Sequence, residues 1–227
     1  MTATQRLNST LLLALVGCFL TGCDRTSNEP TQSPQSNAPS PDPTVGAHQQ
    51  PAPSPPIVAA ARDQIGKTVT YDPSYVRLNY PRGDVPIDRG VCTDVVVRAL
   101  RDGINADLQQ LVHEDMKIAF SQYPTIWGLR KPDRNIDHRR VPNLRRYFER
   151  KGYSIGVSRN KQDYRPGDIV TCKVSNRDHI MIVSDSRTQD GVPLVIHNIG
   201  RGAREEDNLL AFTITGHYRI TRTARAN

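Results

Sequence analysis

Several features that would assign this chain of 227 residues to a function class are absent from its sequence. The longest apolar run covers ten residues, Leu11 to Leu20, and a helix of that length reaches only about 15 Å, too short to cross a membrane. No repeat of about 20–50 residues is visible, which excludes a solenoid or propeller. No run of clustered Lys or Arg is present either, so we expect no nucleic-acid partner.

The first 23 residues have the pattern of a targeting segment. Arg6 provides a positive charge before the apolar run, and small residues then lead to Cys23. The stretch Leu20-Thr21-Gly22-Cys23 resembles a bacterial lipobox, in which the signal is removed before a lipidated Cys. We therefore expect an extracytoplasmic lipoprotein anchored to the membrane through Cys23. An ordinary signal peptide with an incidental Cys is the alternative.

Residues 24–56 have the composition of a tether. They contain nine of the 17 prolines and no aromatic residue. Such a segment cannot bury enough apolar surface to offset its chain entropy. We expect a semi-extended linker that holds a folded domain away from the membrane, with an unused flexible spacer as the plainer interpretation.

The remaining 171 residues, 57–227, are long enough to form one domain without a disulfide. They carry 28 positive and 20 negative side chains, a net charge of +8. This excess suits an anionic polymer or anionic lipid headgroups. We expect a single monomeric domain.

Hydrophobic periodicity predicts helices in the first part of this domain and strands in the second. Three segments have apolar residues at helical spacing: 91–102, 107–120 and the stretch between Pro142 and Gly152. Four later segments have strand patterns: 168–174, 179–183, 192–197 and 212–220. Helices followed by a run of strands indicate an α+β fold with an antiparallel sheet.

One cysteine and two histidines form a candidate nucleophilic site. Cys92 lies in the first turn of a predicted helix, where the dipole and free N–H groups lower the thiol pKa from about 8.5. His179 begins a predicted strand and His197 ends the next, so adjacent antiparallel strands can bring a base and its orienting group together. We interpret Cys172 as a packed core thiol, with a Cys92–Cys172 disulfide as the competing interpretation.

Four motifs occur in the same order as in the NlpC-type cell-wall cysteine peptidases. They are a Cys that opens a helix, a Pro-Gly-Asp turn before a strand, a His that begins the next strand, and a polar residue that ends the one after. Here they are Val91-Cys92-Thr93-Asp94, Arg165-Pro166-Gly167-Asp168, His179-Ile180-Met181 and Val195-Ile196-His197-Asn198. The chain therefore resembles that family.

The resemblance implies a compact papain-like fold and hydrolysis of amide bonds in peptidoglycan stem peptides, with no cofactor. It implies Cys92 as nucleophile, His179 as base and His197 as the residue that orients His179, with Asn198 as the second candidate for that role. Tyr80 stands twelve residues before the Cys, where family members often carry a Tyr near the oxyanion.

A closer resemblance covers roughly residues 57–220. The stretches Val112-His113-Glu114-Asp115-Met116, Pro132 to Arg140 and Ile196-His197-Asn198-Ile199-Gly200 are similar to the bacterial family named domain of unknown function 1287. Thr93 and Asp94 depart from the Ser and Gly that the peptidases usually have. An insert of about residues 104–160 is longer and more charged than theirs.

Charged residues of this insert are candidates for substrate binding. They are His113, Glu114, Asp137, His138, Arg139 and Arg140, to which Asp94 beside the Cys is added. The two arginines could clamp stem-peptide carboxylates, since a guanidinium matches a carboxylate bidentately. A solvated ion-pair cluster for residues 133–140, and a structural or solvent-facing role for His113 and Glu114, remain the alternatives.

Two further functions stay open. A zinc-dependent hydrolase could draw on five histidines with Asp137 and Asp207, although no His-Glu-x-x-His or Cys-x-x-Cys spacing is present and we expect no metal. His217 alternates along a predicted strand and is interpreted as structural. The third possibility is a cell-wall-binding lipoprotein that keeps the fold without activity.

Overall fold

The computed structural model describes residues 53–221; the expected signal segment, Cys23 and most of the expected tether lie outside the described residues. The helices are α1 (Pro56–Arg62), α2 (Cys92–Ile104), α3 (Leu108–Ala119) and α4 (Val141–Arg150), with short 3-10 turns η1 (Phe120–Gln122), η2 (Asp137–Arg139) and η3 (Lys161–Asp163). The strands are β1 (Thr70–Tyr71), β2 (Arg89–Gly90), β3 (Ile169–Val174), β4 (Arg177–Arg187), β5 (Pro193–Asn198), β6 (Ala203–Glu206) and β7 (Thr213–Tyr218). No described helix is long and apolar enough to span a bilayer.

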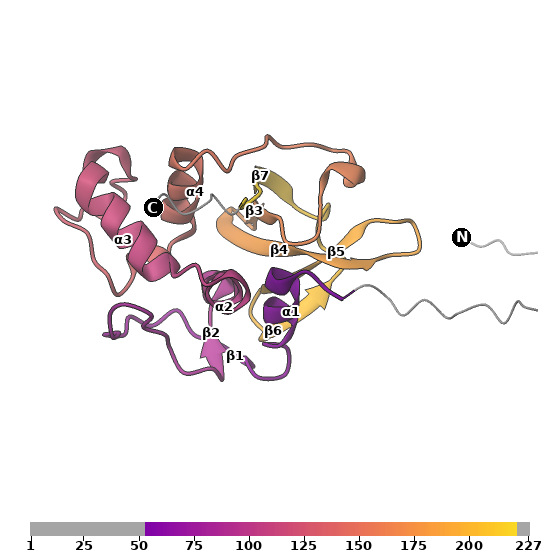
Figure 1. Ribbon diagram of the computed structural model, residues 1–227, viewed down its shortest axis with the longest axis horizontal. Helices are drawn as coiled ribbons and strands as arrows, with labels where there is room; N and C mark the ends of the chain where they lie inside the picture. Colours follow the sequence, from indigo (N-terminus) through magenta and orange to yellow (C-terminus); the bar gives the residue numbers. More distant parts are fainter. Residues whose placement is uncertain (1–52, 222–227) are drawn as a thin grey trace, which may run out of the picture. The chain divides into compact units, whose positions relative to one another are not determined.

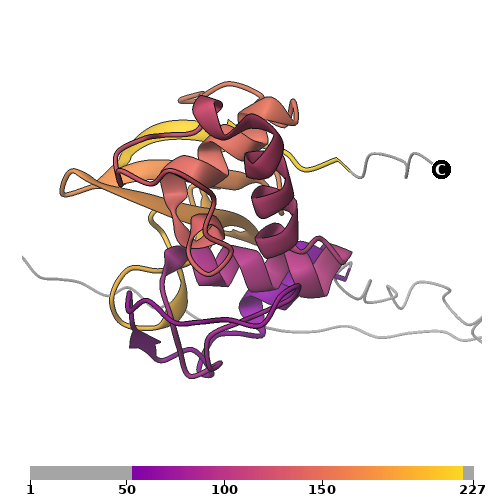
Figure 2. The same cartoon turned by 90° about the vertical axis from the view of Figure 1, so that its left-hand side faces the viewer.

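The fold is α+β, as the periodicity predicts. Strands β3 to β7 form one sheet in the order β6-β5-β4-β3-β7, and every neighbouring pair in it is antiparallel. The α-helices gather on one side of this sheet in Figure 1, and Figure 2 shows the same separation after a quarter turn. All three predicted helices and all four predicted strands are present.

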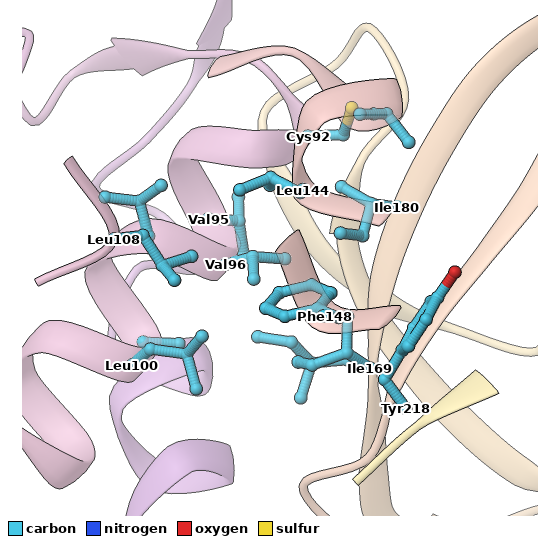
Figure 3. Packing of buried hydrophobic residues seen from close by; sticks show 14 of the residues in the cluster. Cys92, Val95, Val96, Leu100, Leu108, Leu144, Phe148, Ile169, Ile180 and Tyr218 are labelled. Atoms are coloured by element: carbon cyan, nitrogen blue, oxygen red, sulfur yellow. The ribbon is translucent and has the colours of Figure 1, made fainter. Parts of the chain in front are cut away.

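Helix α2 packs on the sheet through its apolar face. Val95, Val96 and Leu100 lie against side chains of the sheet and of α4 in Figure 3, and all are fully buried. Cys92 lies at the end of this cluster, beside Ile180 of β4. Burial of the apolar face of α2 fixes the position of this helix, and its first residue, Cys92, therefore lies next to the sheet.

A second apolar cluster covers the opposite face of the sheet. It contains Cys172 of β3 and Met181 of β4, and it is closed by Tyr164 and Leu209 from the connecting segments. The sheet is thus buried on both faces, and residues that alternate along β3 and β4 belong to different clusters.

The sequence does not predict α1, β1, β2 or β6. Helix α1 packs closely against α2 at Gly103. A side chain would not fit at this position, because an added Cβ would lie 2.6 Å from the Pro56 carbonyl oxygen. Gly103 is therefore a contact residue inside α2. The left-handed residue that ends the helix is Asn105, with φ of 57°.

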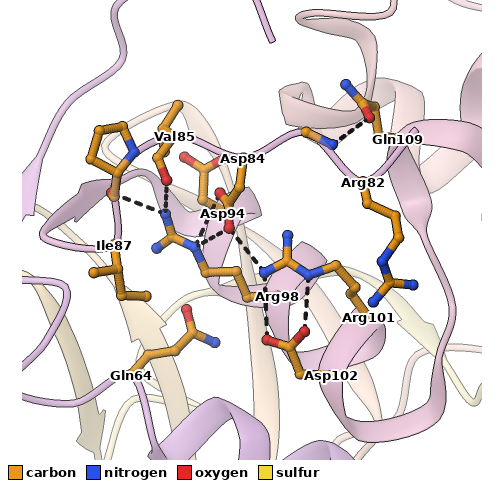
Figure 4. A network of polar contacts seen from close by, with 12 residues as sticks. Gln64, Arg82, Asp84, Val85, Ile87, Asp94, Arg98, Arg101, Asp102 and Gln109 are labelled. Atoms are coloured by element: carbon orange, nitrogen blue, oxygen red, sulfur yellow. Dashed lines mark hydrogen bonds and ion pairs between the residues drawn. The ribbon is translucent and has the colours of Figure 1, made fainter. Parts of the chain in front are cut away.

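A buried arginine fixes the segment that leads into α2. Arg98 is 1% exposed; its guanidinium pairs with Asp84 at 2.9 Å and donates to the carbonyl oxygens of Val85, Pro86 and Arg89 (Figure 4). These bonds hold residues 84–89 against the helix. The position of β2, and hence of the residue before Val91, follows from them.

Candidate functional site

Cys92 lies in the wall of a pocket of about 190 Å³, here named the Cys92 pocket. Tyr71, Ile136, Arg139 and Asp178 are among its other lining residues. Cys92 is the first residue of α2, as predicted, and its side chain is 4% exposed. The pocket is therefore formed by the start of a helix, one end of β4 and segments from the insert.

The thiol of Cys92 does not have the lowered pKa that its place in the helix led us to expect. Burial raises this pKa to about 12, and the charge of Asp94 acts in the same direction. The backbone N–H groups of Ile180, Thr93 and Cys92 itself oppose the shift but do not cancel it. The resting sulfur is a neutral thiol, because desolvation outweighs the helix N-terminus here.

The two predicted histidines do meet. Nε2 of His179 lies 2.7 Å from Nδ1 of His197, and both side chains are buried. Nε2 of His197 lies 3.2 Å from a carboxylate oxygen of Glu206, to which Asn208 also donates. The result is a chain of three side chains from β4, β5 and β6.

This chain fixes the tautomers of both imidazoles. A carboxylate only accepts, so His197 donates from Nε2 to Glu206, and its Nδ1 is then the acceptor. His179 therefore donates from Nε2, which leaves its Nδ1 with a free lone pair. Burial lowers the pKa of His179 to about 3, with the neighbouring His197 as a second cause, so the ring is neutral.

The side chains of Cys92 and His179 are not hydrogen-bonded and lie on opposite faces of the sheet. The Cys92 thiol lies at the backbone N–H of Ile180, one residue further along β4. His179 shares the parity of Met181 on the opposite face of the sheet, and Cys172 lies directly across the ladder from it. Within residues 53–221 no hydrogen bond joins the Cys92 thiol to an imidazole, and both cysteines are free thiols.

Asn198 does not orient His179. Its amide donates to the carbonyl oxygen of Gly90 at 2.9 Å, and its side-chain oxygen accepts from Gly200. Successive side chains of β5 point to opposite faces, so Asn198 is turned toward α2 while His197 faces the other side. Both polar groups of Asn198 are used in these two hydrogen bonds. Asn198 instead fixes the backbone two residues before Cys92.

Tyr80 is also not at the site. Its ring packs edge-on against His113 at 5.3 Å, with the guanidinium of Arg134 over it, and it does not line the Cys92 pocket. Tyr71 lines the pocket instead, because β1 pairs with β2 and puts Tyr71 opposite Gly90. Burial and the nearby Cys92 raise the pKa of Tyr71. A two-residue strand leaves no periodicity that could have identified it.

Asp94 and Arg139 form a buried ion pair and do not offer free groups to a substrate. The guanidinium meets the carboxylate through two bonds of 2.8 and 3.0 Å, and it also donates to the carbonyl oxygens of Asp72 and Ser74. Thr93 donates to the backbone oxygen of Arg139. The two departures from the peptidase pattern, Thr93 and Asp94, thus attach the insert to the start of α2.

Asp137, His138 and Arg140 are likewise committed to structure. Burial raises the pKa of Asp137 to about 6, and Arg140 pairs with it at 3.2 Å while stacking on Trp127. His138 is buried, with a pKa lowered to about 4 by desolvation and then by Arg139. Residues 133–140 do form ion pairs, but Asp137, His138 and Arg139 are buried and not solvated, and Arg139 and Arg140 are not a free carboxylate clamp.

His113 and Glu114 lie on different sides of α3. Glu114 is exposed and accepts from Gln110. His113 contacts Tyr80 and lines a second groove, and it does not line the Cys92 pocket. His217 is structural: it bonds Asp168 at 2.7 Å.

Zinc has no site in the described part of the chain. Among residues 53–221 no three His, Cys, Asp or Glu side chains converge as metal ligands. Asp137 pairs with Arg140, and His217 is hydrogen-bonded to Asp168, so neither is free to coordinate.

The buried histidines make the free energy of unfolding depend on pH. The folded pKa values of His138 and His179, about 4 and about 3, lie below the ordinary value, so the unfolded chain binds more protons between about pH 4 and 6.5. Asp137 has the opposite effect on stability: its folded pKa of about 6 lies above the ordinary value, so it offsets the contribution of one histidine. We expect the free energy of unfolding in urea to fall by about 1 kcal/mol per pH unit as pH drops from 6 to 4.5. In His138→Gln this slope should be smaller; an unchanged slope would contradict the assignment.

The fold and site define an α+β protein with a helix-terminal cysteine on one face of its sheet and a buried histidine pair on the other. A family described as "Domain of unknown function (DUF1287)" matches residues 58–220, and the chain belongs to this family. It is also similar to "Uncharacterized protein YijF" of Escherichia coli (strain K12), at 56% identity over 164 residues, which are 72% of this chain and 80% of the relative.

Proposed function

We propose that the protein is a cysteine hydrolase that cleaves amide bonds in peptidoglycan stem peptides, with Cys92 as nucleophile, His179 as base and His197 as the residue that orients it. The observation that carries this proposal is the chain from Glu206 through both imidazoles. It leaves Nδ1 of His179 with a free lone pair, one residue along β4 from the amide that contacts the Cys92 thiol, while at rest the imidazole lies on the other face of the sheet.

The reaction would proceed through a thioester. As Sγ of Cys92 bonds to the amide carbonyl carbon, the thiol proton passes to Nδ1 of His179. The carbon–nitrogen bond then breaks and the amine leaves with that proton. Water adds to the thioester, again giving a proton to His179, and the carbon–sulfur bond breaks to restore the thiol. The backbone N–H of Cys92, with the hydroxyl of Tyr71, would stabilise the oxyanion; one such donor is typically worth about 3 kcal/mol.

The resting protonation states show what substrate binding must change. Proton transfer from a thiol of pKa about 12 to an imidazole of pKa about 3 is uphill. The thiolate and imidazolium attract each other strongly once both form in a dry site, and Glu206 supports the imidazolium through His197. A catalytic Cys–His contact is often loose without substrate and tightens when the substrate is bound. Because the two side chains lie on opposite faces of β4 at rest, we infer that substrate binding must move the imidazole to the face of the thiol.

The anchoring would place this chemistry at the cell wall. A lipid at Cys23 and the proline-rich segment 24–56 would hold residues 57–227 within reach of peptidoglycan from the membrane surface. Stem peptides are rich in carboxylates, and the net charge of +8 on residues 57–227 would attract them.

A second function is favoured by a specific observation. The neutral, 4% exposed thiol without an imidazole partner is the state expected of a non-catalytic wall-binding lipoprotein. Incubation of purified sacculi with the full chain separates the two. New soluble fragments identified by mass would support the hydrolase and name the bond that is cut. Binding to sacculi without any new fragment would contradict hydrolysis and leave the binding function.

Glu206 provides a prediction within the hydrolase proposal. Replacing it with Gln removes the charge that supports the imidazolium, so we expect turnover to fall about 10²-fold. The acidic limb of the pH–rate profile should also move to lower pH, because the conjugate acid of His179 is less stable. Glu206→Asp should recover part of the rate. A loss of rate without any change in the pH profile would assign Glu206 a purely structural role.

A further inference from the structure

A second groove, here named the basic groove, lies in the insert between α3 and η2. Its volume is about 650 Å³, and it is lined by residues 128–135 with Tyr75 and His113. Three cations of its lining, Arg130, Lys131 and Arg134, are exposed. None of the three has a carboxylate within ion-pair distance among residues 53–221.

The carboxylate in the lining is already occupied. Asp133 accepts from the Tyr75 hydroxyl at 3.0 Å, and from both the backbone and the side chain of Asn135. Three cations against this one carboxylate leave the lining with a net positive charge. Tyr75 and Leu129 add apolar surface beside it, with Tyr75 59% exposed.

The basic groove and the Cys92 pocket are lined by different residues of the same two segments. Residues 71–75 supply Tyr71 to the pocket and Tyr75 to the groove, and residues 133–139 supply Ile136 to the pocket and Asn135 to the groove. Arg139 ties the two segments together through the carbonyl oxygens of residues 72 and 74. The two openings thus lie along the same two segments, which is the placement that a chain-like ligand occupying both would need.

We propose that the basic groove binds carboxylate groups of peptidoglycan stem peptides and so positions the substrate for Cys92, an inference that rests on the proposed function. The clamp predicted at Arg139 and Arg140 is instead formed by cations a few residues earlier, none of which is paired with a carboxylate, although Arg134 also lies over the Tyr80 ring. A concave groove beside a pocket suits a peptide, which can enter it, better than a lipid surface, which cannot.

The test measures binding rather than turnover. The full chain carrying Cys92→Ala is pelleted with purified sacculi, with and without Arg130→Gln, Lys131→Gln and Arg134→Gln together. We expect about tenfold weaker binding in the triple variant, and the same loss when sacculus carboxylates are amidated. The matched control neutralises Arg159, Lys161 and Arg165, three cations of the 155–165 segment that do not line either site.

The outcomes are separable from those of the hydrolase test. Equal binding by both triple variants, or full binding to amidated sacculi, would overturn the groove assignment even if wild-type protein cleaves the wall. Groove-dependent binding by the Cys92→Ala protein supports it even if no cleavage is found. Binding to vesicles of 3:1 phosphatidylcholine and phosphatidylglycerol that requires the same three cations would assign the groove to the membrane and overturn the proposal.

Discussion

Cys92→Ala is expected to abolish the release of fragments from sacculi, with a loss of roughly 10⁴-fold or more, because it removes the sulfur that forms the proposed thioester. The fold should persist, since Ala keeps the helix start and leaves only a small cavity at the edge of the apolar cluster. Mass spectrometry of soluble muropeptides gives the rate, and circular dichroism verifies the fold.

Cys172→Ala is the matched control, since it removes the other buried free thiol of the described domain. We expect it to retain turnover. Cys172 lies directly across the ladder from His179, so the comparison also tests which thiol the imidazole serves. Loss of activity in Cys172→Ala but not in Cys92→Ala would transfer the nucleophile to β3 and refute the mechanism proposed here.

The fold was predictable from the sequence wherever an element buries a regular face. Segment 107–120 repeats apolar residues at helical spacing, and the structure has α3 there, with Asp107 as its N-cap accepting from Gln109. The charged strand β6 and the two-residue strands have no such pattern. They exist because their neighbours supply hydrogen-bond partners, a tertiary effect that local propensity does not contain.

The site was predictable in its partners but not in its energetics. The positions of His179 and His197 at the ends of successive strands predict their contact, and the structure confirms it at 2.7 Å. The prediction of a lowered thiol pKa was wrong, because the effect of the helix N-terminus can be inferred from sequence position, whereas the depth of burial cannot. Glu206 was missed because a polar edge strand gives no sign of which side chain will face His197.

The second large effect is expected on stability, at Asp94, one of the residues that depart from the peptidase pattern. Asp94→Ala is expected to destabilise the protein by roughly 3–5 kcal/mol, because it leaves the Arg139 guanidinium buried without its counter-charge. Asp94 also accepts from the Val91 backbone N–H at 2.7 Å, so the substitution removes a helix cap as well. Urea unfolding of the full chain, followed by circular dichroism, measures the change.

Variants at the same pair separate the charge from the cap. Asp94→Asn keeps an oxygen that can accept from Val91 but loses the charge, so most of the destabilisation should remain. Asp94→Leu with Arg139→Met replaces both buried charges by apolar groups and should recover much of the stability lost in Asp94→Ala. Asp63→Asn, at the exposed pair with Lys67, is the surface control and should leave the unfolding midpoint unchanged.

Asp94→Ala should also open the Cys92 pocket. Without Asp94 the guanidinium of Arg139 no longer joins the start of α2 to the carbonyl oxygens of Asp72 and Ser74. The thiol then gains water, its pKa falls from about 12, and iodoacetamide should alkylate Cys92 faster at pH 8 than in the wild type. An equal alkylation rate in the two proteins, measured while both remain folded, would show that burial of the thiol does not depend on this ion pair.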